Sequence, residues 1–205
     1  MLDKTQDPTA PETGLRCESL RDALRTHTDA DHRALDARLS TLNLLIPERR
    51  LSFCQVQLIG FRRLQAACGG EAAEASAVLA RLIAALEAEC AADPMGEPPA
   101  TPLVLHPDAV AYVTLGAQLG TAMMRRALPD DQQTGYFALE PDMGAWRAFC
   151  DRMGARDPLS GDALPLLRDA GRAFEVFLAA AEIVLGAPVE TMPPDPAELV
   201  QGVPA

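Results

Sequence analysis

Residues 18–39 read ESLRDALRTHTDADHRALDARL. The four leucines of this stretch, Leu20, Leu24, Leu35 and Leu39, fall on one side of a helix that turns about 100° per residue. Charged and small residues fill the other side. The stretch therefore predicts one amphipathic helix whose leucine stripe packs against other helices.

Further stretches of this kind follow, separated by proline and glycine. Helices are expected over 48–67, 71–92, 108–128, 143–153 and 162–185. Asp108 and Asp142 are the expected N-caps of two of them, and Gly186 is expected to end the last. Aromatic residues make up only 4% of the chain, and no stretch predicts a strand. The predicted fold class is all-α, a single-domain bundle of about six helices.

The helical stretches define the expected domain organisation. Residues 1–17 are interpreted as a flexible leader, 18–186 as the helical domain and 187–205 as a proline-rich tail. A connector over 93–107 carries five prolines, and its histidine, His106, is expected to face solvent.

Charge and cysteine content exclude several classes of protein. The 205 residues include 18 Lys and Arg against 29 Asp and Glu, a net charge of -11, which argues against nucleic acid or an anionic membrane as partner. The apolar stretch 176–185 is interrupted by Glu182 and is too short to span a membrane. The five cysteines form no CxxC pair, and the polar residues 1–16 do not resemble a signal peptide. A cytoplasmic location is expected.

Two histidines on the first predicted helix are candidate metal ligands. His27 and His32 lie at opposite edges of the leucine stripe, each about 70° from its centre, so helical geometry does not choose between them. An edge histidine with a hydrogen bond is the simpler interpretation. Imidazole is also a common axial ligand of haem iron. Asp31 falls near the middle of the stripe, where a carboxylate is unexpected.

The predicted helix over 108–128 contains two glycines one turn apart, Gly116 and Gly120. Each costs about 1 kcal/mol relative to alanine inside a helix. Close packing against another helix would explain them, and so would a flat ligand lying against the backbone. Spacing alone favours helix packing.

Signatures of other enzyme classes are absent from the sequence. It contains no GxxxxGK[ST] or GxGxxG phosphate loop, no GxSxG nucleophile elbow and no HExxH zinc motif. Paired Glu-x-x-His ligands of a di-iron bundle are also missing.

Three segments in order resemble the heme oxygenase family. LRTHTDADHRALD at 24–36 resembles its first-helix signature, in which a threonine precedes the proximal histidine by four residues and a basic residue precedes it by seven. AYVTLGAQLG at 111–120 resembles the distal helix of the bacterial branch encoded beside bacteriophytochromes. WRAF at 146–149 is similar to the aromatic-basic segment that follows.

The resemblance implies a fold, a reaction and a set of site residues. Haem would lie between the first and distal helices as substrate and cofactor, and O2 with an external electron donor would open it to biliverdin, iron and carbon monoxide. A reductase or ferredoxin-type protein would be the donor, and a bacteriophytochrome the biliverdin acceptor. The implied residues are His32 as iron ligand, Arg25, Thr28 and Arg147 around the haem, and Gly116, Ala117, Gly120 and Thr121 on the distal helix.

Three residues depart from the family pattern. Thr121 replaces a glycine, Ala117 stands where animal-type members have an aspartate that orders distal water, and Asp31 adjoins the implied ligand. Thr121 is expected to obstruct the pocket or to use its hydroxyl on bound O2, and Gln118 could share that polar role. Two alternatives follow: a haem- or biliverdin-binding regulatory protein without turnover, and a purely structural bundle.

Overall fold

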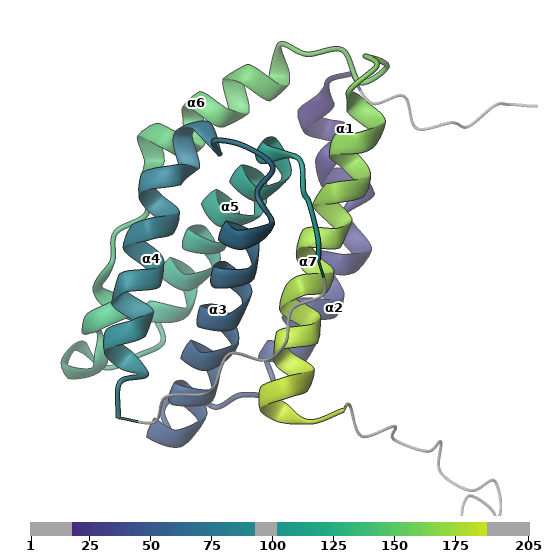
Figure 1. The fold of residues 1–205 in the computed structure, drawn as a ribbon. Coiled ribbons are helices and arrows are strands. Elements are labelled where there is room, and N and C mark those ends of the chain that lie inside the picture. Colours follow the sequence, from purple (N-terminus) through teal and green to yellow (C-terminus); the bar gives the residue numbers. More distant parts are fainter. Residues whose placement is uncertain (1–17, 93–101, 188–205) are drawn as a thin grey trace, which may run out of the picture.

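The computed structural model describes residues 18–92 and 102–187, which form seven α-helices and three short 3-10 helices (Figure 1). The α-helices are α1 (Leu20–His27), α2 (Asp29–Leu39), α3 (Pro47–Ala67), α4 (Ser76–Glu89), α5 (Pro107–Arg125), α6 (Met143–Gly154) and α7 (Ala163–Leu185). The 3-10 helices are η1 (Ala73–Ala75), η2 (Asp130–Gln132) and η3 (Gly135–Ala138). The all-α prediction is confirmed for this part of the chain. The leader, most of the connector and the tail lie outside the described residues.

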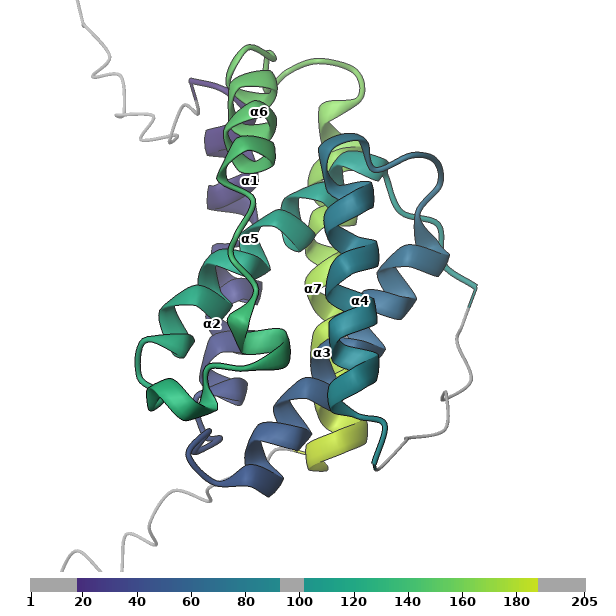
Figure 2. The same ribbon diagram turned by 90° about the vertical axis from the view of Figure 1, so that its left-hand side faces the viewer.

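Helix α7 is the axis of the bundle. It packs against α3, α5, α2 and α1, and α4 covers the other side of α3 (Figures 1 and 2). Gly60 lets α3 approach α7 closely: a Cβ at this position would lie 2.3 Å from Cε1 of Phe177. The Phe177 ring meets Phe61 edge to face with centroids 5.1 Å apart. None of the described helices is long and apolar enough to cross a membrane.

The helix predicted over 18–39 is divided at Thr28 into α1 and α2. Thr28 has φ -94° and ψ 2°, and its hydroxyl donates to the Leu24 carbonyl at 2.9 Å. A threonine that bonds back to the preceding turn bends a helix, which accounts for the division. The helix predicted over 71–92 likewise starts late, because η1 precedes α4.

Two of the three predicted terminal signals are confirmed. Asp142 caps α6 by accepting from the Ala145 N–H, and Gly186 ends α7 with φ +77°. The prediction for Asp108 is wrong: His106 is the N-cap of α5, and its Nδ1 accepts from the Asp108 N–H at 3.1 Å. Pro107 occupies the first helical position, which suits its fixed φ and moves the cap to the residue before it. His106 is accordingly half-buried.

The Asp108 side chain belongs instead to a half-buried ion-pair cluster, the carboxylate clamp, formed by Glu74, Asp108, Arg152 and Arg156. Asp108 accepts from Arg152 at 2.6 Å and from Arg156 at 2.8 Å. Glu74 accepts from Arg152 through both carboxylate oxygens and, through this bond, has its pKa lowered. The clamp ties η1, the start of α5 and the end of α6 together.

Candidate functional site

His32 lies on α2 with an imidazole that is held in place yet largely exposed. Its side chain is 57% exposed, and its Nδ1 lies 2.9 Å from Oδ2 of Asp36 one turn later. Phe174 of α7 meets the ring edge to face at 5.6 Å between centroids. A carboxylate on Nδ1 fixes that nitrogen as the protonated one and leaves the lone pair of Nε2 for a metal.

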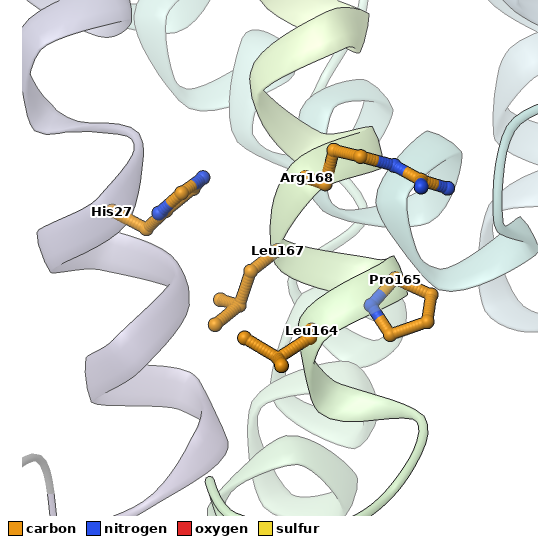
Figure 3. Close-up of a pocket in the computed structure, with 5 residues that line it drawn as sticks. All are labelled: His27, Leu164, Pro165, Leu167 and Arg168. Atoms are coloured by element: carbon orange, nitrogen blue, oxygen red, sulfur yellow. The ribbon is translucent and has the colours of Figure 1, made fainter.

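His27 has different surroundings. It lines a pocket of about 360 Å³ between α1 and α7, with Leu164, Pro165, Leu167 and Arg168 as the other lining residues (Figure 3). Figure 3 shows the Arg168 guanidinium directed away from His27, and its Nε donates to Asp169 at 3.1 Å. Three of the five lining residues are therefore apolar, and His27 and Arg168 are the polar ones.

Asp31, the unexpected carboxylate of the leucine stripe, also faces α7. A Cβ on Gly171 would lie 3.3 Å from Oδ2 of Asp31 and 3.9 Å from Nε2 of His27. Because Gly171 of α7 has no side chain, the Asp31 carboxylate and the His27 imidazole both fit against α7 at this position. Asp31 is half-buried here and does not point toward α5.

The two glycines of α5 face open space. Among the described residues, a Cβ at Gly116 or at Gly120 would have no atom of another part of the chain within 4 Å. Helix packing would place atoms of another helix there, as Phe177 does at Gly60. For the described part of the chain, the preference for packing that spacing suggested is therefore wrong, and no other described helix covers α5 at these two glycines.

A row of aromatic rings connects His32 to this glycine face. Phe174 lies between His32 and Tyr112, with ring centroids 5.6 and 6.5 Å away respectively. Tyr112 is one helical turn before Gly116 on α5. On its other side Tyr112 stacks on Phe149 of α6 at 6.1 Å. His32 and the glycines therefore border the same region of the bundle.

The two arginines that the resemblance implies lie on neighbouring helices. The Leu20 N–H at the start of α1 donates to the Arg156 carbonyl just beyond α6, so the two helices run antiparallel (Figure 2). Arg25 lies on α1 and Arg147 on α6, and these two helices contact each other. Both side chains are exposed, and within the described residues neither guanidinium forms an ion pair; Arg147 donates only to the Met143 carbonyl of its own helix.

The remaining implied residues point elsewhere. Thr121 is buried; its hydroxyl donates to the Ala117 carbonyl at 3.1 Å and accepts from Tyr136 at 3.0 Å. Gln118 is also buried and accepts from the Asp142 N–H. Both polar side chains thus leave the glycine face, and Ala117 packs at the edge of the core. Thr28 is buried between α1 and α2, and its hydroxyl lies 3.2 Å from that of Tyr112 on α5.

Sequence reasoning assigned no role to Asp36, Phe174 or Tyr112. The spacing of four residues between His32 and Asp36 on a helix could have identified Asp36 as its partner. Phe174 is distant in sequence and carried no such signal. Within residues 18–92 and 102–187 no group of three His, Cys, Asp or Glu side chains is arranged to hold a metal ion. Comparisons of the chain with protein-family models, curated proteins and solved structures found no match.

Proposed function

We propose that this protein binds haem between α2 and α5 and opens the macrocycle to biliverdin, as heme oxygenases do. The observation that carries the proposal is the face of α5 at Gly116 and Gly120, which no other described part of the chain covers and where neither residue places a side chain between the backbone and a flat ligand. Two glycines inside one helix reduce its intrinsic stability, and the contacts of neighbouring helices do not explain them. A planar ligand against the backbone does.

His32 is the proposed axial ligand. Asp36 orients the His32 ring by binding its Nδ1, which leaves the lone pair of Nε2 free to bind a metal. Phe174 packs against the same ring and limits its rotation. When bound, haem supplies the iron that activates O2 and is itself the carbon skeleton that is oxidised. His32 would hold the haem through Nε2, and the chain's own contribution at this position is to bind and orient the group.

Arg25 and Arg147 are the proposed partners of the haem propionates. Both are exposed, they lie on the contacting helices α1 and α6, and neither forms an ion pair with a carboxylate of the described residues. Guanidinium groups bind carboxylates through charge-assisted hydrogen bonds. Two guanidinium groups without an ion pair among the described residues suit a dianionic ligand even in a protein of net charge -11.

Haem binding without turnover is the second candidate function. It is favoured by the engagement of the Thr121 hydroxyl with Tyr136 and the Ala117 carbonyl, which removes the polar side chain that could have assisted O2. The glycine face then offers space but no hydroxyl or carboxylate from these positions.

A haem titration of the purified protein tests the proposal. We expect a Soret band with an imidazole-ligand signature that His32→Ala abolishes and His27→Ala, the matched control, retains. Asp36→Ala should weaken haem binding by about tenfold, because the ligand loses its orienting carboxylate. A wild-type protein without a Soret shift, or loss of the band in His27→Ala alone, would overturn the assignment.

Turnover is tested separately on the haem complex. With a ferredoxin and its reductase as the electron source, the heme oxygenase proposal expects the Soret band to decay and the visible absorption of biliverdin to replace it. A complex that is reduced and binds carbon monoxide but releases no biliverdin would support the second candidate.

A further inference from the structure

Thr28 joins α1 to α2 and is the most buried residue of the junction. Its side chain is 1% exposed, although the helix around it is largely open to solvent. The hydroxyl donates its single proton to the Leu24 carbonyl at 2.9 Å. The carbonyl of Thr28 in turn accepts from the His32 N–H at 2.9 Å, so Thr28 is one backbone hydrogen bond away from the proposed ligand.

The proton count at Thr28 fixes the direction of a second bond. Oγ1 of Thr28 lies 3.2 Å from the Tyr112 hydroxyl on α5. Because Thr28 has already given its proton to Leu24, the Tyr112 O–H must be the donor. Burial raises the pKa of the Tyr112 phenol above its ordinary value, so the donor proton is retained at neutral pH.

The Tyr112 ring is held in place by two aromatic contacts. Its ring stacks on Phe149 of α6 and meets Phe174 of α7 edge to face. Phe174 also touches the His32 ring. The Thr28–Tyr112 pair thus bridges α1–α2 and α5 at the level of the aromatic row.

We propose that the Thr28–Tyr112 hydrogen bond is a latch that sets the direction of α2 relative to α5, and that both residues position His32 without touching haem. The helix is interrupted at Thr28, where the hydroxyl donates back to the Leu24 carbonyl, and the bond from Tyr112 ties this interruption to α5. His32 follows Thr28 by one turn. Its placement over the glycine face rests on the proposed function; the latch itself does not.

Amide hydrogen exchange of the protein without haem tests the latch directly. Tyr112→Phe removes only the bond between the helices, and the amides of residues 29–36 should then exchange about fivefold faster, as expected for one lost hydrogen bond. Thr28→Val should accelerate them at least as much, whereas Thr28→Ser keeps the hydroxyl and should exchange as the wild type does. The amides of α4 are the internal control. Unchanged exchange over 29–36 in Tyr112→Phe would overturn the proposal.

Haem titration of the same variants tests the positioning of His32. We expect Thr28→Val and Tyr112→Phe to weaken haem binding and to alter the axial-imidazole signature, and Thr28→Ser to restore both. Identical affinity and spectra in all variants would refute the positioning role. If wild-type protein binds no haem while Tyr112→Phe still accelerates exchange over 29–36, the proposed function fails and the latch stands.

Discussion

The two halves of α5 have opposite environments within one continuous helix. Over 107–115 nearly every residue is buried, and the carboxylate clamp holds the start of the helix. Over 116–125 one face is uncovered, with Gly120 exposed and Met123 70% exposed. Burial and ion pairs stabilise the first half of α5. The second half has two glycines and fewer contacts, so its local stability is lower, as is common in segments that bind ligands.

The first half should therefore respond to substitution through folding. Asp108→Ala removes two charge-assisted hydrogen bonds from a part-buried cluster, while Arg152 keeps Glu74 and Arg156 keeps Asp162 as partners. The free energy of unfolding should fall by about 2 kcal/mol. Urea denaturation measures this value, and Asp131→Ala at an exposed position of η2 is the control. A loss no greater than that of Asp131→Ala would mean that the clamp contributes nothing beyond a surface ion pair.

A glycine that does serve helix packing provides the contrast to the open face. Gly60→Ala would place a methyl group 2.3 Å from the buried Phe177 ring, so α3 and α7 must separate or the ring must move. Overpacking of this kind should lower the free energy of unfolding by about 2 kcal/mol. Phe177→Leu in the same chain should recover part of that loss by making room. Thermal unfolding of the single and double variants checks both values.

Substitutions of Thr121 test whether this residue belongs to the core or to the glycine face of α5. Thr121→Val removes the acceptor of the buried Tyr136 hydroxyl, and the free energy of unfolding should fall by about 1.5 kcal/mol. Haem affinity should be unchanged, because the side chain faces the core. Thr121→Ser retains the hydroxyl and serves as the control. Stability equal to wild type together with faster biliverdin formation would instead place Thr121 in the pocket.

Local sequence patterns predicted most of the fold. Leucine spacing and the proline and glycine breaks located the helices, because burial of an apolar stripe and loss of a backbone donor act over a few residues. The division at Thr28 and the cap at His106 were missed. Both depend on side-chain hydrogen bonds to the backbone, from Thr28 to the Leu24 carbonyl and from the Asp108 N–H to His106. The sequence pattern was equally compatible with a continuous helix and with an Asp108 cap.

The surroundings of the candidate residues were predicted only in part. Helical spacing gave His27 and His32 equal weight, and only the family resemblance selected His32. The structure adds two contacts of His32: Asp36, which its spacing of four residues could have indicated, and Phe174, which no local pattern indicates. The direction of Thr121 depends on Tyr136, a residue in a 3-10 helix with no periodic pattern. Contacts between segments distant in the chain carry this information, and helical spacing does not record them.

Gly116→Ala and Gly120→Ala should change the free energy of unfolding least. The sign of that change tests most directly whether the two halves of α5 differ in packing. Each methyl group would meet open space, so the protein without haem should gain up to about 1 kcal/mol in its free energy of unfolding from helix propensity alone. Gly60→Ala changes the same residue type and moves stability the opposite way. Urea denaturation of the three variants measures this sign difference.

With haem present, the Gly116→Leu variant should bind haem more weakly while its circular dichroism spectrum is preserved, because the larger side chain occupies the space proposed for the ligand. Destabilisation by Gly116→Ala would show that this face is covered by packing and would remove the observation on which haem binding rests.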